Sequence, residues 1–455
     1  MNKLFCAVMT SVVLLFVGCG TDGNKFTSPS GIAVTARSSS ILISWQTVDS
    51  SLGYNVYRSD VSGALSTKQC IAFGLTASSY LDSSATPGVT YYYQVTAYNS
   101  AGNSSPSAEL STYIKGPSAT GDPLKMSFNV FTLAGTGKSG KVDGTGTGAS
   151  FGFPVGITAY GPNLYVADTY NNIIRKIVIS TGVVTTIAGS AASGTQDGTG
   201  AAARFYNPFG IATDGTNLYV SDTSNNTIRS IVISTGVVTT LAGAPTSGSS
   251  NGTGAVASFK APRGITINGN YLYVADSGNH MIRKIDISAN KLINGVVTTF
   301  AGSITAGSAD DNGIAASFGA PEGIATDGTS LYVTDSTNNT IRKITLAGAV
   351  TTIAGSGTAG ATDAEGTSAS FNTPTGIVTD GSSLFIADSK NNVIRSIDIT
   401  IPGRAPVSTV AGSGSAGSAS GFGTAASFSQ PMGITTDGTN IFVSDYANCL
   451  IREIL

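Results

Sequence analysis

Six aspartates each precede an arginine by seven positions, and these pairs are the most regular charged groups in the chain. An Asp at a strand end can accept backbone N–H bonds in the following turn. An Arg can bind a carboxylate or neighbouring carbonyls through two N–H groups. Catalysis requires an asymmetric set of groups around one substrate, whereas these pairs recur in a fixed frame. We therefore predict a structural role for all six: Asp168 and Arg175, Asp222 and Arg229, Asp276 and Arg283, Asp335 and Arg342, Asp388 and Arg395, Asp445 and Arg452.

The chain offers few other groups for catalysis or metal binding. Its one histidine, His280, lies in a turn, so neither a zinc site nor a Ser/His/Asp triad is expected. A calcium site needs several oxygen ligands at one place. The six variable positions that we expect near the centre of the fold supply one carboxylate, Glu322, which we expect to pair with Arg263. These positions are Val155, Phe209, Arg263, Glu322, Thr375 and Met432. We predict no enzyme activity, no metal and no cofactor.

Asp/Gly-rich segments such as D-G-T-G, at 143–146 and 197–200, are a further candidate for calcium binding. Comparable places elsewhere hold Asn251, Asn312, Asp363 and Ser420, and the terminal carboxylate of a calcium loop is missing. We favour instead a loop whose Phe side chain fills a gap between neighbouring structural units. The six phenylalanines are Phe151, Phe205, Phe259, Phe318, Phe371 and Phe428.

All these residues belong to a long internal repeat. The stretch from Pro208 to Gly243 recurs six times, with prolines at 154, 208, 262, 321, 374 and 431, at spacings of 54, 54, 59, 53 and 57 residues. Each copy contains four runs of β-branched and aromatic residues bounded by Asp-Gly and Thr-Gly turns. Six four-stranded antiparallel units predict an all-β, six-bladed β-propeller.

The repeat motif P-x-G-I…L-Y-V-x-D-x-x-N-N-x-I-R-K-I resembles the NHL repeat, as at Leu164 to Ile177 and Leu331 to Ile344. The resemblance covers residues 127–455. It implies a propeller used mainly as a binding platform, although a minority of related propellers are enzymes.

The two ends of the propeller region complete each other. The region opens with V-F-T-L-A-G, which matches a fourth strand without the first three, and the chain ends after a third strand, I-R-E-I-L. We expect the strand from Val130 to Ala134 to pair with the strand from Ile451 to Leu455, which closes the sixth blade.

The first residues are typical of an export signal. Lys3 is followed by an apolar run from Ala7 to Val17, which is shorter than the ~20 residues that span a membrane. F-V-G-C resembles a bacterial lipobox, which implies a signal peptide over 1–18 and acylation of Cys19, with a tether over 19–29. Gly20 after the cysteine implies the outer membrane, on its periplasmic or its outer side.

Residues 30–115 lack the repeat and alternate with period two, as in I-L-I-S-W at 41–45 and Y-Y-Y-Q-V-T-A-Y at 91–98. About seven short strands predict a β-sandwich. The pattern is similar to a fibronectin type III domain, which implies that Trp45 is the core tryptophan and Tyr91 the corner tyrosine. Tyr93, Val95 and Ala97 are expected to face inward. A Gly/Pro-rich linker over 116–126 follows.

Composition excludes a polyanion partner. Charged residues are 11% of the chain and the net charge is −2, so we expect no nucleic-acid binding. Of four cysteines, Cys6 leaves with the signal peptide and Cys19 is expected to be acylated. Cys449 stands where other repeats have Asn or His, and a disulfide between Cys70 and Cys449 stays open.

Two functions remain after these exclusions. The favoured one is a monomeric, membrane-anchored binding or adhesion module, with the propeller as recognition head for a protein or glycan and the sandwich as spacer. The alternative is a carbohydrate- or lactone-active enzyme with a central-channel site. Links between blades should share one face with the turns between second and third strands, and that face varies between copies. The candidate ligand-binding residues there are Phe209, Arg263, Glu322, Met432, Tyr206, Lys260, Tyr170 and Gln430.

Overall fold

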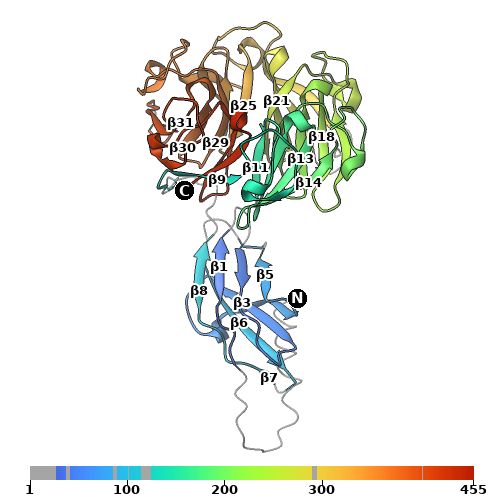
Figure 1. Ribbon diagram of the computed structural model, residues 1–455, viewed down its shortest axis with the longest axis vertical. Helices are drawn as coiled ribbons and strands as arrows, with labels where there is room; N and C mark the ends of the chain where they lie inside the picture. The colour runs from blue at the N-terminus through green and yellow to red at the C-terminus, as the bar shows by residue number, and fades with distance from the viewer. Residues whose placement is uncertain are drawn as a thin grey trace, which may run out of the picture. The chain divides into compact units, whose positions relative to one another are not determined.

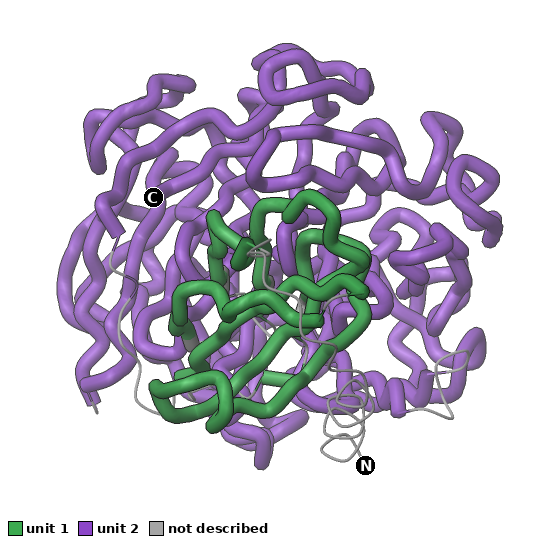
Figure 2. Tube along the Cα trace, turned by 90° about the horizontal axis from the view of Figure 1, so that it is seen from below, with its two compact units in different colours: residues 1–116 green, residues 117–455 purple. Residues whose placement is uncertain are grey.

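The computed structural model divides the chain into two compact units, residues 1–116 and 117–455 (Figure 2). It describes residues 27–36, 41–82, 84–85, 90–100, 102–113, 124, 126–288, 295–401 and 403–455. The predicted signal peptide, Cys19, and most of the predicted tether and linker lie outside these ranges. Across the described ranges, no helix has both the length and the apolar character needed to cross a membrane.

The first unit is a sandwich of two antiparallel sheets. One sheet has the order β1-β2-β5, and the other joins β4, β3, β6 and β7, with β8 also paired to β6. The strands are β1 (Ala33–Ala36), β2 (Ile41–Ser44), β3 (Gly53–Ser59), β4 (Gln69–Leu75), β5 (Ser79–Asp82), β6 (Thr90–Asn99), β7 (Gly102–Asn103) and β8 (Leu110–Tyr113), with a 3₁₀ turn η2 (Leu65–Thr67).

The sandwich core follows the period-two alternation of its longest strand. Tyr93, Val95 and Ala97 on β6 are fully buried, as predicted, and they pack with Trp45 in one apolar cluster. The Tyr93 hydroxyl donates to Asp82 at 2.8 Å, and Asp82 also accepts from Arg58 at 2.8 Å. Asp82 therefore satisfies the buried hydroxyl of Tyr93, whereas the Nε1 of Trp45 is buried without a hydrogen-bond partner among the described residues.

The second unit is the predicted six-bladed propeller (Figure 1). In each blade the innermost strand begins at the repeat proline or shortly after it, and the chain then moves outward strand by strand. Blade 1 has β11 (Ile157–Tyr160), β12 (Asn163–Asp168), β13 (Ile173–Val178) and β14 (Val183–Gly189). Blade 2 has β16 (Pro208–Thr213), β17 (Asn217–Asp222), β18 (Thr227–Val232) and β19 (Val237–Ala242). Blade 3 has β21 (Pro262–Asn268), β22 (Tyr271–Asp276), β23 (Met281–Asp286) and β24 (Val296–Gly302).

The remaining blades repeat this order. Blade 4 has β25 (Pro321–Thr326), β26 (Ser330–Asp335), β27 (Thr340–Thr345) and β28 (Val350–Ala354). Blade 5 has β29 (Pro374–Thr379), β30 (Ser383–Asp388), β31 (Val393–Asp398) and β32 (Val407–Ala411). Blade 6 has β34 (Pro431–Thr436), β35 (Ile441–Asp445), β36 (Leu450–Ile454) and β9 (Asn129–Ala134).

Blade 6 is closed by the two ends of the propeller region, as predicted. β9 pairs antiparallel with β36, with Ala134 opposite Ile451 and Val130 opposite Ile454. All four residues are fully buried. The closure therefore covers what would otherwise be an exposed sheet edge.

The structure adds a fifth, two-residue strand to the outer edge of four blades, where we expected four strands in each. These strands are β10 (Gly144–Thr145), β15 (Gly198–Thr199), β20 (Gly252–Thr253) and β33 (Gly421–Phe422). They arise because each link runs along the outer edge of the blade it enters before returning to the repeat proline. Short 3₁₀ turns follow in the links: η3 (Gly146–Gly148), η5 (Gly200–Ala202), η7 (Gly254–Val256), η9 (Gly313–Ala315), η10 (Gly366–Ser368) and η12 (Gly423–Ala425).

Phenylalanines from these links fill the spaces between blades, as predicted. Phe205, for example, packs with Tyr165 and Ile174 of blade 1 and with Leu218 and Val220 of blade 2. All six phenylalanines are fully buried. The apolar core of the propeller is thus a set of shared interfaces between neighbours, so a blade cannot bury its surface alone.

The invariant glycine of P-x-G-I is explained by close approach between blades at the centre. A Cβ atom on Gly156 would collide with the backbone carbonyl of Phe209, and Gly210 would collide with that of Arg263. The same clash recurs around the ring, ending with Gly433 against Val155. These glycines let the six innermost strands meet around one axis.

Candidate functional site

The six Asp–Arg pairs are buried in the framework of the propeller. In every pair both side chains are completely shielded, with N–O distances of 2.8 to 3.2 Å. Arg175 shows the pattern: its guanidinium also donates to the carbonyls of Ser150 and Val142 and lies 5.0 Å from the Phe151 ring. Burial raises the pKa of all six aspartates, that of Asp388 to about 6. The pairs hold backbone groups together, which agrees with their predicted structural role.

The Asp/Gly-rich segments take part in the same framework, which the sequence did not indicate. Asp143 accepts from Arg175 at 2.8 Å and from the Thr186 backbone N–H at 3.1 Å. The equivalent residue of blade 4 is Asp310, which contacts Arg342 and precedes it by 32 residues, as Asp143 precedes Arg175; the prediction of Asn312 for this place is wrong. Blade 3 uses Asn251 in this role, at 2.9 Å from Arg283.

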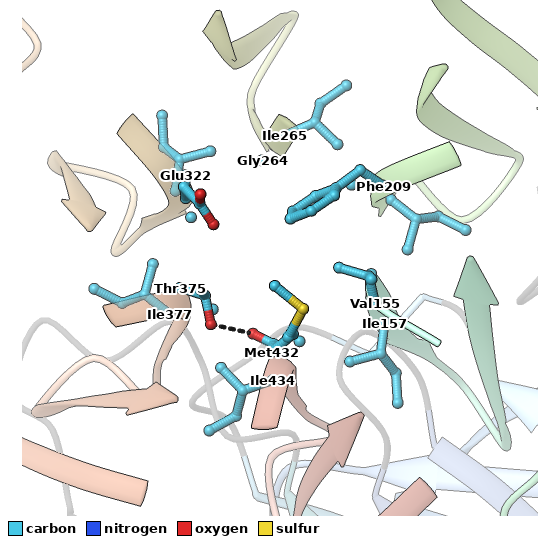
Figure 3. Close-up of a pocket in the computed structure, with 17 residues that line it drawn as sticks. Val155, Ile157, Phe209, Gly264, Ile265, Glu322, Thr375, Ile377, Met432 and Ile434 are labelled. Atoms are coloured by element: carbon cyan, nitrogen blue, oxygen red, sulfur yellow. Dashed lines mark hydrogen bonds between the residues drawn. The ribbon is translucent and has the colours of Figure 1, made fainter. Parts of the chain in front are cut away.

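Five of the six variable residues of P-x-G-I line the opening at the axis of the propeller (Figure 3): Val155, Phe209, Glu322, Thr375 and Met432. The side chains of Phe209, Glu322, Met432 and Val155 point toward the central opening. The opening is a cavity of about 70 Å³, far below the 300–1,000 Å³ of usual ligand pockets. Thr375 turns aside and donates to the Met432 carbonyl at 3.0 Å.

Arg263 and Glu322 form an ion pair across blades 3 and 4, as predicted. Arg263 also lies over the Phe209 ring, 5.0 Å from its centre. Burial raises the pKa of Glu322, and the charge of Arg263 opposes that shift. The second oxygen of Glu322 is buried and has no hydrogen-bond partner among the described residues.

A larger pocket opens beside the axis, on the face that carries the turns between second and third strands. Its volume is about 360 Å³, within the usual range for ligand pockets. Five of its nine lining residues are aromatic or cationic: Phe153, Tyr170, Phe209, Arg263 and Tyr446. The others are Thr169, Asn207, Thr223 and Ser224.

The structure brings some candidate residues together and leaves others apart. Phe209, Glu322 and Met432 line the axial cavity, while Phe209, Arg263 and Tyr170 line the larger pocket. The remaining candidates, Tyr206, Lys260 and Gln430, are exposed and line neither cavity.

Near the repeat prolines, the links lie on the same face of the propeller as the turns between second and third strands, as predicted. The Tyr170 N–H donates to the Gly152 carbonyl at 3.0 Å, and the Ser224 N–H donates to the Tyr206 carbonyl at 3.1 Å. The middle of each link instead reaches the opposite face, where Gly200 N–H meets the Gly236 carbonyl at 2.9 Å. Only the last residues of a link can therefore contribute to a site near the axis.

Phe153 is a pocket residue that sequence reasoning missed. It precedes Pro154 and has φ of 51°, a left-handed conformation that bulky residues rarely adopt. Its position in the repeat could have pointed to it, because an aromatic residue replaces Asn207, Ala261 or Thr373 of other copies.

The described residues form no cluster of side chains suited to bind a metal ion. No three His, Cys, Asp or Glu side chains come together among these residues as candidate ligands. His280 caps a turn with φ of 59°, and its Nδ1 contacts the Gly319 carbonyl. Cys449 takes the corresponding position in blade 6, where burial raises the pKa of its thiol.

A search of family models identifies residues 27–113 as a fibronectin type III domain. NHL repeat-containing protein 2 of Gallus gallus is 29% identical over 332 residues, which are 65% of this chain and 45% of that protein. The chain spans less than half the length of the curated relatives that share its repeats.

Two solved structures from Bacteroides thetaiotaomicron share the fold over nearly the whole chain. A structural genomics protein aligns with a TM-score of 0.56 at 20% identity, covering 96% of this chain and 99% of its own. An auxiliary nutrient binding protein aligns with a TM-score of 0.54 at 17% identity, covering 95% and 98%. At these identities the likeness concerns architecture.

Proposed function

We propose that this chain, a fibronectin type III domain joined to an NHL-repeat propeller, is an exported binding protein anchored to the outer membrane. The propeller is the recognition head, and the sandwich is a spacer between the head and the lipid anchor. Ligand is taken up on the face that carries the turns between second and third strands. The fold that the chain shares with an auxiliary nutrient binding protein supports a binding role.

One observation carries this proposal. The charged groups that recur in all six blades are consumed by the framework, because each buried Arg is occupied by Asp and carbonyl partners. Near the axis, in contrast, Phe209, Arg263 and Glu322 differ from blade to blade and are only partly used by contacts within the protein. Variation on a rigid scaffold is where a repeat protein gains specificity.

The same observation favours binding over catalysis. The carboxylate at the axial cavity, Glu322, is held by Arg263 and buried, with no second acid beside it in the cavity lining. A general acid–base pair would need a second titratable group within reach of the same substrate. The Phe209 ring lies beside the thioether of Met432 in the axial cavity and beside the guanidinium of Arg263 in the larger pocket, and such side chains are instead typical of a binding hot spot.

Anchoring rests on the lipobox-like F-V-G-C and on Cys19. One acyl chain gives only marginal membrane binding, whereas several chains on one cysteine anchor a protein stably. We expect Cys19→Ser to release the protein into the soluble fraction or to leave it unprocessed. Fractionation of cells after a salt wash measures this outcome. If Cys19→Ser still sediments with outer-membrane lipids, the anchor assignment is wrong.

Recognition is tested on the soluble chain 21–455, first on glycan and peptide arrays. We expect Phe209→Ala combined with Arg263→Ala to weaken binding of the array ligand at least about tenfold, since hot-spot residues each contribute upwards of ~1–2 kcal/mol. Titration calorimetry with that ligand gives the dissociation constant.

Asp214→Ala is the control on the opposite face. Asp214 caps the turn between β16 and β17 and accepts from the backbone N–H groups of Thr216 and Asn217 at 2.8 and 2.6 Å. Its loss should lower stability without changing affinity, and thermal melts of both variants separate the two effects. The reverse pattern, with affinity lost in Asp214→Ala alone, would place the site on that opposite face.

A further inference from the structure

The junction between blades 6 and 1 departs from the repeat in several positions at once. In the other blades, the first residue after the framework Asp is Ser or Thr, and in blades 1, 2, 4 and 5 its hydroxyl donates to the carbonyl of the next repeat proline. Thr169 donates to Pro208 at 2.7 Å, and Thr223 donates to Pro262 at 2.6 Å. Blade 6 has Tyr446 in this position. The junction therefore has an aromatic ring where blades 1, 2, 4 and 5 have the Ser or Thr hydroxyl that bonds to the next blade.

The other side of this junction departs from the repeat as well. The residue before the proline is Phe153 in place of a small or polar residue, although its backbone is left-handed. In neighbouring blades the N–H of that residue is bound by an Asn side chain: Asn207 N–H meets Asn172 at 2.8 Å, and Ala261 N–H meets Asn226 at 2.9 Å. Blade 6 offers Cys449 instead, whose sulfur accepts from the Phe153 N–H in place of an amide oxygen. Residues that break a local rule without structural gain are expected at functional sites.

These departures converge on one pocket. The Phe153 ring lies 5.7 Å from Tyr170, edge-on, and 5.2 Å from Tyr446, tilted. Tyr170 is 68% exposed, so one wall of the 360 Å³ pocket is an aromatic surface open to solvent. Phe209 and Arg263 form the wall nearer the axis.

The rest of the lining is polar and carries no net charge. The Asn207 side chain donates to the Ser224 hydroxyl at 3.1 Å, which leaves both groups with further hydrogen-bonding capacity. The charge of Arg263 is balanced by Glu322, and its Nε has no partner among the described residues. Such a lining favours a neutral ligand rich in hydroxyl groups over a strongly charged one.

We propose that this pocket binds a pyranose ring of a glycan chain. The apolar C–H face of the sugar stacks on the exposed ring of Tyr170, and the inclined rings of Phe153 and Tyr446 complete the apolar wall around it. Sugar hydroxyls around the rim exchange hydrogen bonds with Asn207, Ser224 and Arg263. This inference rests on the proposed recognition face and names the class of ligand that it takes.

Another cleft of the propeller is larger but chemically weaker. It has a volume of about 520 Å³ and is lined by Ser, Thr, Asn and Gly residues of blade 4 and of the links before and after it. This cleft has no aromatic ring to desolvate one face of a sugar. The Ser and Thr hydroxyl groups of its lining would only exchange hydrogen bonds with water for hydrogen bonds with the sugar, which contributes little net binding free energy.

The test uses the soluble chain 21–455 in affinity gel electrophoresis, with soluble starch, xylan, galactomannan and laminarin in separate gels. We expect retardation in at least one gel. Tyr446→Ser and Phe153→Asn restore residue types found in other blades. They should therefore keep the melting temperature while weakening binding about tenfold or more, and Tyr170→Ala should weaken it similarly.

Tyr206→Ala is the matched control, because Tyr206 is an exposed tyrosine of the neighbouring link and lies outside the pocket. It should leave retardation unchanged. Absence of retardation in all gels, or retardation that persists in the three pocket variants, overturns the glycan site. Array binding to peptides alone, lost in the Phe209→Ala, Arg263→Ala variant, overturns the glycan assignment but retains the recognition face. Glycan binding lost only in Asp214→Ala overturns both.

Discussion

A fragment that begins at Gly137 is expected to aggregate or to lose cooperative unfolding. It lacks β9, so β36 becomes the exposed edge of blade 6, and exposed edges pair with other chains. The fragment also removes Val130 and Ala134 from the apolar clusters on either side of that blade. Both residues are fully buried in the intact propeller. Thermal unfolding followed by circular dichroism, with light scattering for aggregation, measures the outcome.

The fragment 117–455 is the matched control, because it removes the sandwich but keeps β9 and the whole second unit. We expect it to unfold in a single transition. Equal melting behaviour in the two fragments would show that ring closure through β9 is dispensable. The comparison thus separates loss of the closing strand from loss of the neighbouring domain.

Asp222→Ala is expected to destabilise the propeller by about 3–5 kcal/mol, the usual effect of removing one partner of a buried ion pair. The substitution leaves Arg229 buried with a partly compensated charge, since both side chains are fully shielded. It also deprives the Tyr206 N–H and the Asn225 amide of their acceptor, at 2.7 and 2.8 Å. Urea denaturation gives the change in the free energy of unfolding.

Asp197→Asn provides a control on the same arginine. Asp197 contacts Arg229 at 2.6 Å, but its side chain is 48% exposed. Blade 3 already has Asn251 in this role, bound to Arg283. We expect a loss below about 1 kcal/mol, as for exposed ion pairs. If both variants lose a similar free energy of unfolding, then burial does not determine how much each carboxylate contributes to stability.

The two kinds of residue in this propeller have separate tasks. Groups that recur in every blade hold the links against the sheets, and their hydrogen-bonding capacity is taken up by partners within the protein. Groups that differ between blades collect near the axis and at the junction of blades 6 and 1. Function in this chain is therefore expected where the symmetry fails.

The sequence by itself determined the architecture, because a propeller blade is built from contacts close in the chain. Asp168 and Arg175 lie on the paired strands β12 and β13, so a fixed spacing of seven is enough to bring them together. The pairing of Arg263 with Glu322 also followed, since equivalent positions in successive blades must be neighbours. The closing pairing of β9 with β36 followed from two incomplete repeats.

Only the tertiary structure decided which variable residues meet. Phe153 and Tyr446 are almost 300 residues apart, and ring closure alone brings their aromatic rings within 5.2 Å. The role of Asp310, in contrast, was readable from the sequence, because Asp310 precedes Arg342 by 32 residues just as Asp143 precedes Arg175. Periodicity describes contacts that every blade shares. The pocket at the junction between blades 6 and 1 is built from residues that differ from the repeat. These residues meet only when the two ends of the propeller region close the ring, and no local spacing in the sequence encodes that contact.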